Sequence, residues 1–393
     1  MKTSPATGAV LLLLLLLWSG PAASGGLSTP GQGARALGMA GAFTAVADDG
    51  SAIYYNPAGI GQIDGTVIEV SAASISPQLR YTTPGGATEE STKRALAPGL
   101  FITHRFADKL SGGLGLYSPY ARDAEIGDDL GHGFASQRAK MVRTDFSAVI
   151  AYQASAAVSV GAGLILGYSQ IDQSLPAGPV LRITDRMDGT GVGGIIGVLW
   201  KVSDSLKAGV AYRSGMSIDH QGDRTMAVAG AETKSNARVR VHYPASLGLG
   251  LALSPSENLT LALDADWYGW SSMDQVTTRT DSWPDSTTQL NAKNSRDIRI
   301  GVEYRLPAAW SIRAGYAHIQ GAFPGTHIIP VQPDGDGHEI ALGIGRKIGS
   351  WKIDFAYQYA VAREQDLTAN IYGYNGKQNI SQHMLGLAAA YRY

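Results

Sequence analysis

The chain has 393 residues, no cysteine, 49 glycines and a formal net charge of -1 at pH 7. Without cysteine there can be no disulfide and no cysteine-ligated metal site, and the balanced charge gives no indication of nucleic-acid binding. The mean hydropathy is near zero. Ordinary soluble proteins have a mean hydropathy near zero. Membrane barrels have it too, because their apolar lipid-facing residues and polar lumen-facing residues cancel in the average.

An export signal is predicted at residues 1–24. Lys2 precedes a short apolar run, Ala9–Trp18, and small residues follow up to Ser24, which is the pattern of a cleaved secretory signal. The run is too short for a membrane anchor, which needs about 20 apolar residues. No cysteine lies at the cleavage point, so a lipoprotein is excluded. The sequence therefore predicts an exported protein without membrane helices after residue 24.

Residues 31–64 are rich in glycine and alanine and contain a tight turn, Asn56-Pro57-Ala58. Their pattern fits neither an amphipathic helix nor an alternating strand, whereas the chain after them alternates. Glycine and alanine permit close packing against a wall. We therefore expect residues 25–65 to form a plug inside a barrel built by residues 66–393.

The clearest alternation runs over residues 238–253. This stretch is longer than the roughly 5–6 residues of an ordinary strand and suits a tilted strand that crosses a membrane and projects beyond it. A basic side chain on the lipid face costs about 2–4 kcal/mol at the midplane. We therefore expect the valine and leucine face to point outward, and the polar face of this strand and the next to line the lumen: Arg238, Arg240, His242, Asp264 and Asp266.

Turn signals divide the rest of the chain into an even number of alternating segments joined by connections that are alternately short and long. Short periplasmic turns and long outer loops are typical of bacterial outer-membrane barrels. The predicted fold is an all-β, antiparallel transmembrane barrel of about fourteen strands, too wide to be filled by its own wall side chains. The predicted strands are 66–82, 93–106, 110–118, 138–153, 156–172, 189–202, 205–218, 236–253, 257–274, 295–306, 309–320, 338–348, 351–362 and 380–393.

The motifs of the chain resemble those of the FadL/TodX family, the long-chain fatty acid and aromatic hydrocarbon transporters of the Gram-negative outer membrane. The resemblance covers almost the whole mature chain. It rests on GARALGMAGAFTAVADD at 33–49, NPA at 56–58, RAKMVRTDFSAVIAY at 138–152, HYPASLGLGLAL at 242–253, DADWYGWSSMD at 264–274 and the ending HMLGLAAAYRY.

The resemblance implies a monomeric barrel in contact with outer-membrane lipids and lipopolysaccharide. It implies passive, hatch-gated uptake of a hydrophobic small molecule, such as a fatty acid or hydrocarbon, and sideways release into the bilayer. Cofactors, metals and nucleic acid are not implied. Asn56, Pro57 and Ala58 match the family's hatch motif. Gly112, Gly113 and Pro119 lie where the family's inward kink would fall, whereas no local motif aligns the basic residues that bind the carboxylate in the family.

Several alternatives stay open. Arg35, Asp48 and Asp49 of the plug are expected either to join the polar wall residues named above in a network that steadies the plug, or to be solvated lumen lining. The chain could also be a partner or scaffold of an outer-membrane secretion system, or a general polar porin. An enzyme is not expected, because no nucleophile elbow or histidine–glutamate metal motif is present.

Overall fold

The computed structural model describes residues 28–29, 31–91, 93–127, 136–177 and 180–393. The predicted export signal, residues 1–24, lies outside these ranges. Among the described residues, no helix has the length and apolar character that a membrane crossing requires.

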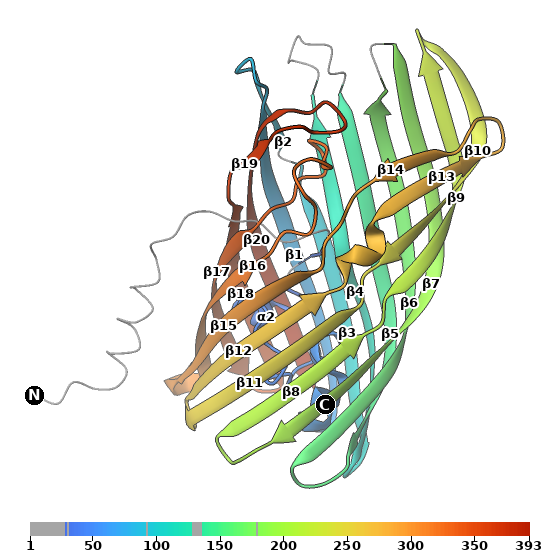
Figure 1. Ribbon diagram of the computed structural model, residues 1–393. Coiled ribbons are helices and arrows are strands. Elements are labelled where there is room, and N and C mark those ends of the chain that lie inside the picture. Colours follow the sequence, from blue (N-terminus) through green and yellow to red (C-terminus); the bar gives the residue numbers. More distant parts are fainter. Residues whose placement is uncertain (1–27, 30, 92, 128–135, 178–179) are drawn as a thin grey trace, which may run out of the picture.

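The chain forms a closed antiparallel barrel of 14 strands (Figure 1), as the alternation predicts. Neighbours in sequence pair around the wall, and β1 pairs with β20 to close it. Two wall strands are interrupted and carry two labels each. The wall consists of β1 (Thr66–Thr82), β3 (Ala95–Ala107), β4 (Leu110–Ile126), β5 (Gln137–Gln153), β6 (Val158–Pro176), β7 (Leu181–Lys201), β8 (Leu206–Arg213) with β9 (Met216–Val228), β10 (Ala231–Tyr243) with β11 (Ser246–Ser256), β12 (Leu259–Tyr268), β15 (Ser295–Leu306), β16 (Trp310–Ile319), β17 (Gly337–Ile348), β18 (Trp351–Ala362) and β20 (Gly376–Arg392).

Short elements complete the structure. The long connections contain β2 (Thr88–Ser91), η2 (Trp270–Met273), β13 (Gln275–Thr280), β14 (Ser286–Gln289) and β19 (Gln365–Leu367), and η3 (Pro307–Ala309) lies in a short turn. The segment before β1 contains α2 (Ala34–Leu37), α3 (Ala52–Tyr55) and η1 (Pro57–Gln62). This part, residues 31–63, is called the luminal segment below. It is almost entirely buried and lies inside the barrel, towards the end with the short turns (Figure 1).

The outer surface of the wall is apolar, as predicted. Leu249, Leu251 and Leu253 of β11 are exposed, as are Leu263 of β12 and Ile300 of β15. Glycine, alanine and polar residues alternate with them on the inner face. The strands therefore present a lipid-compatible belt to the outside.

The predicted lumen position of Arg238, Arg240 and His242 is wrong. Val239 and Tyr243 of the same strand are buried inside, whereas Arg240 is exposed and pairs on the outside with Asp219 at 2.6 Å. Arg238 faces Asp281 at 4.0 Å, and His242 shares a hydrogen bond with Ser217.

The physical reason is an interruption of the strand at Pro244-Ala245. β10 ends at Tyr243, where it is paired with β9, and β11 begins at Ser246, where it is paired with β8. Proline cannot donate to a strand ladder. The neighbouring strand is interrupted at the same level, between Arg213 and Met216, and there its pairing with β7 shifts by one residue. A shift of one residue turns the side chains to the other face. The apolar side chains therefore point inward in β10 and outward in β11.

Candidate functional site

The luminal segment touches the wall where wall residues have no side chain. A Cβ atom at Gly197 would overlap Oδ1 of Asn56, and one at Gly209 would overlap the carbonyl oxygen of Thr44. At Gly315 a Cβ atom would overlap the backbone of Met39. The glycines of the inner face therefore leave room for the luminal segment to pack directly against the backbone of the wall.

Hydrogen bonds attach the Asn56-Pro57-Ala58 turn to the barrel wall. The Asn56 side-chain oxygen accepts from Ala58 N at 3.2 Å, which caps η1. Its amide nitrogen donates to Thr44 O at 2.9 Å and to Val198 O of β7 at 3.0 Å. The hydroxyl of Ser159 on β6 donates to Ala58 O at 2.9 Å. The turn thus joins two parts of the luminal segment to two wall strands.

We expect Gly197→Ala to weaken this attachment. The new methyl group would push Asn56 away from β7, and overpacking of this kind costs about 1–3 kcal/mol. Hydrogen–deuterium exchange of residues 56–62 should become roughly tenfold to a hundredfold faster. Gly194→Ala is the matched control on the same strand, because its nearest neighbour would be a carbonyl oxygen at 3.5 Å. Equal exchange in the two variants would contradict the role of Gly197.

A first cluster of buried charges ties the luminal segment to β15. Arg35 pairs with Asp48, lies 3.6 Å from Asp49 and donates to both carboxylate oxygens of Glu303 at 2.7 and 2.9 Å. Glu303 also accepts from Arg313 at 2.6 Å. Burial opposes ionisation of Asp48, but the Arg35 guanidinium outweighs it and holds the pKa of Asp48 below its ordinary value. The structure thus brings Arg35, Asp48 and Asp49 together.

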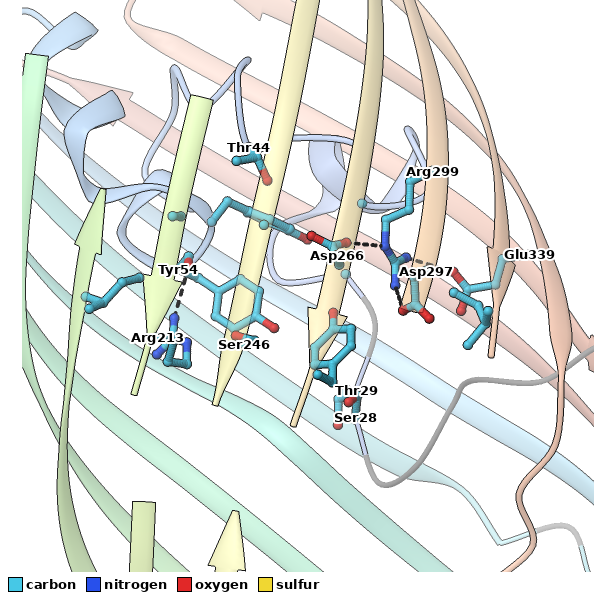
Figure 2. A pocket seen from close by; sticks show the side chains of 18 residues that line it. Ser28, Thr29, Thr44, Tyr54, Arg213, Ser246, Asp266, Asp297, Arg299 and Glu339 are labelled. Atoms are coloured by element: carbon cyan, nitrogen blue, oxygen red, sulfur yellow. Dashed lines mark hydrogen bonds and ion pairs between the residues drawn. The ribbon is translucent and has the colours of Figure 1, made fainter. Parts of the chain in front are cut away.

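A second cluster surrounds Arg299 of β15 (Figure 2). Its guanidinium lies 2.9 Å from Asp266, 2.7 Å from Asp297 and 3.2 Å from Glu339, and it donates to Ala40 O of the luminal segment at 2.9 Å. A cavity of about 80 Å³ adjoins this cluster.

Asp264 and Asp266 lie on the inner face, as expected. Oδ2 of Asp264 accepts from Phe43 N at 2.8 Å and from Thr44 N at 2.7 Å, so Asp264 holds the luminal segment by its backbone. Asp266 instead belongs to the Arg299 cluster.

Sequence reasoning missed the principal wall residues of both clusters. Asp297, Arg299 and Glu303 alternate with isoleucine and valine along one strand. That spacing marks them as one face of the strand, so the signal was present. Glu339 and Arg313 come from other strands, and no local pattern assigns them to the same clusters.

An apolar cavity of about 130 Å³ occupies the half of the lumen nearer the long connections. An aromatic cluster borders it: the ring of Trp270 packs on Phe323, whose side chain lines the cavity, and on Tyr120. Lys140, Asp185, Arg224 and His327 are among its polar lining residues. The apolar lining consists of Ala139, Met141, Ile171, Met187, Val239, Val241, Met273, Val276, Leu290, Phe323 and Ile328.

The wall is irregular between β3 and β4. Their pairing ends at Leu100–Leu116, and the β4–β5 register shifts between Tyr117 and Tyr120. Pro119 lies within this shift, and its carbonyl accepts from Thr29 N at 2.8 Å.

The other two residues predicted at this kink, Gly112 and Gly113, are paired regularly with both neighbouring strands. The structure therefore places the irregularity at Pro119 and away from the two glycines. A small cavity of about 70 Å³ lies beside it, lined in part by Ile75, Leu79, Ala95 and Ala121.

Comparison with known proteins agrees with this architecture. Residues 15–393 match the family model described as outer membrane protein transport protein (OMPP1/FadL/TodX). The long-chain fatty acid transport protein of Escherichia coli is 22% identical over 386 residues, which are 86% of this chain and 85% of the relative.

Two crystal structures show the same fold. A FadL homologue of Pseudomonas aeruginosa superposes with a TM-score of 0.85 at 20% identity, covering 93% of this chain and 99% of the other. The Pseudomonas putida toluene transporter TodX superposes with a TM-score of 0.79 at 20% identity, covering 94% and 100%.

Proposed function

The chain belongs to the outer membrane protein transport family (OMPP1/FadL/TodX), and from this premise we propose that it takes up small, neutral, hydrophobic molecules across the outer membrane. The luminal segment acts as the hatch. The observation that carries the proposal is the apolar cavity beside Phe323 and Trp270. An apolar solute gains free energy when it leaves water for such a cavity.

The size of the cavity supports a compact substrate. Its volume is about 130 Å³, close to the roughly 150 Å³ of an engineered apolar cavity that binds benzene. A molecule with one aromatic ring fits this space better than a long alkyl chain does. Among the solved structures of the same fold, TodX of Pseudomonas putida is described as a toluene transporter.

The charged clusters around the luminal segment disfavour a carboxylate substrate at that level of the lumen. Among the described residues, nine buried carboxylate side chains accompany six buried arginines. The arginines of the two clusters already contact several carboxylates each. An additional carboxylate at these two clusters would meet further carboxylates, whereas the apolar cavity itself is lined by Arg122, Lys140 and Arg224 with one carboxylate, Asp185.

We further propose that the substrate leaves sideways, through the gap between β3 and β4. The loss of pairing after Leu100–Leu116 and the small cavity beside Ala95 and Ala121 support this route. Thr29 and Gln32 bond to the backbone of Pro119 and Ser118 at the gap, so movement of the hatch would be transmitted to the opening. Release into the bilayer spares the apolar molecule a passage through water.

Val239→Trp tests the cavity. The indole would fill much of the space, and we expect uptake of labelled toluene by cells that express the variant to fall at least tenfold. Val192→Trp is the matched control, because Val192 is 69% exposed on the outside of β7. Unchanged toluene uptake by Val239→Trp would overturn the assignment of the site.

Native mass spectrometry of protein from its own membrane separates this proposal from the secretion-partner hypothesis. We expect a co-purifying apolar small molecule. An empty lumen together with a co-purifying protein would favour a partner or scaffold role.

A further inference from the structure

The cavity beside Arg299 is lined by several acidic side chains (Figure 2). The uptake of neutral hydrocarbons does not require such a lining. Three carboxylates, those of Asp266, Asp297 and Glu339, line the cavity and share the single guanidinium of Arg299. All four side chains are at most 15% exposed. One arginine therefore balances three carboxylates.

The second arginine in the lining is directed elsewhere. Arg213 donates to Tyr54 O at 2.9 Å and to the hydroxyl of Tyr117 at 3.1 Å. Its nearest carboxylate is Asp145, at 3.9 Å, which already forms two hydrogen bonds with Arg143. Arg213 thus contributes long-range charge but forms no ion pair with the acidic cluster.

Polar atoms without hydrogen-bond partners belong to residues that line the same cavity. Within the described part of the chain, Oγ1 of Thr29 and Oε1 of Glu339 have no hydrogen-bond partner, although these residues are 4% and 0% exposed. The phenol oxygen of Tyr55, a third lining residue, interacts with the backbone of Gln32 but has no hydrogen bond of ordinary geometry. The side-chain amide of Gln358 interacts with Glu339, although no hydrogen bond of ordinary geometry joins them. Buried polar groups are rarely left in this state.

We propose that this cavity binds the ammonium group of a small organic amine. Such a group carries the positive charge that the cluster lacks and donates three hydrogen bonds, one of which Glu339 Oε1 can accept. Thr29 Oγ1 and Tyr55 Oη are further acceptors. Among the described residues, no group of three acidic, histidine or cysteine side chains is placed to hold a metal ion, so an organic cation fits better than a metal.

The size of the site limits what it takes. Its volume of about 80 Å³ suits a head group and not a whole amphiphile, since one water molecule occupies about 30 Å³ of liquid. A carboxylate head of the same size would lie against three carboxyl groups that already share one guanidinium. The site therefore discriminates amines from carboxylates of equal chain length. The inference rests on the proposed uptake function only for the route by which the amine arrives.

Isothermal titration calorimetry on the purified full-length protein in nanodiscs tests the inference with octylammonium, octanoate and octan-1-ol. Empty nanodiscs correct for partition into lipid. We expect octylammonium to bind at least tenfold more tightly than octanoate. Glu339→Gln should weaken octylammonium binding about tenfold and leave octan-1-ol binding unchanged. Asp219→Asn is the matched control, because its ion pair lies on the outer surface, and it should behave as wild type.

Equal binding of octylammonium and octanoate would overturn the inference and leave ordered water as the content of the cavity. Octylammonium binding that is insensitive to both Glu339→Gln and Asp297→Asn would overturn it as well. Gel migration before and after heating confirms that each variant is folded. Failure of toluene uptake would count against the proposed function alone, because the calorimetric measurement requires no transport.

Discussion

Replacing Arg299 with methionine should release the luminal segment from the barrel wall. The guanidinium of Arg299 contacts three buried carboxylates and donates to Ala40 O. Methionine keeps much of the side-chain volume but leaves the carboxylates without their counter-charge. Breaking a buried ion pair on one side costs about 3–5 kcal/mol. Hydrogen–deuterium exchange of residues 38–47 should therefore accelerate by roughly two to three orders of magnitude.

Arg240→Met is the matched control for this experiment. Arg240 forms an ion pair of comparable geometry with Asp219, at 2.6 Å, but both side chains are more than half exposed. Exposed pairs contribute only about 0–1 kcal/mol, so exchange should stay as in the wild type. If Arg299→Met left the protection of residues 38–47 unchanged, the cluster would not hold the luminal segment in place.

Leu249→Arg should impair insertion into the membrane. Leu249 lies in the middle of β11 and is 48% exposed among other apolar side chains of the outer face. Moving an arginine into the apolar belt costs about 2–4 kcal/mol near the midplane. We expect a clear loss of the heat-modifiable, folded band on cold gel electrophoresis of reconstituted protein.

Gln221→Arg is the control for the insertion experiment. Gln221 is also exposed, but it lies on β9 beside the charged outer residues Asp219 and Asp223. A new arginine there lies between Asp188 of β7 and Arg238 of β10, its paired neighbours, and not among lipid tails. Folding of Leu249→Arg as efficient as that of Gln221→Arg would show that the apolar face of β11 does not meet the bilayer core.

The strand order and most strand limits could be predicted from residues alone. Predicted and observed limits coincide for β1, β15 and β18. Alternation with a period of two and turn residues are local properties, so they need no knowledge of the neighbours. The same holds for the apolar outer face of β11, where Leu249, Leu251 and Leu253 follow each other at spacing two.

The tertiary structure decided what depends on pairing between strands. Alternation continues across Pro244-Ala245 in the sequence, yet β10 and β11 point their apolar side chains to opposite sides. The change of face accompanies a one-residue shift of β8 and β9 in their pairing with β7, and nothing in residues 238–253 encodes that shift.

The residues of the candidate site also fall into those that the sequence could identify and those that only the tertiary structure brings together. Asp264, Asp266 and Arg35 were identifiable as inward or plug residues, because each lies on a polar face or in the glycine-rich segment. Their partners Glu303, Arg299 and the amides of Phe43 and Thr44 lie far along the chain. The alternation of the chain after residue 65 and the glycine-rich segment before it indicated a plugged, lipid-exposed barrel. Barrel closure brings β12, β15 and β17 around the luminal segment, and only then are the carboxyl groups beside Arg299 placed near their partners. Ion pairing depends on distance in space and not on spacing in sequence, so the sequence could not predict these pairs.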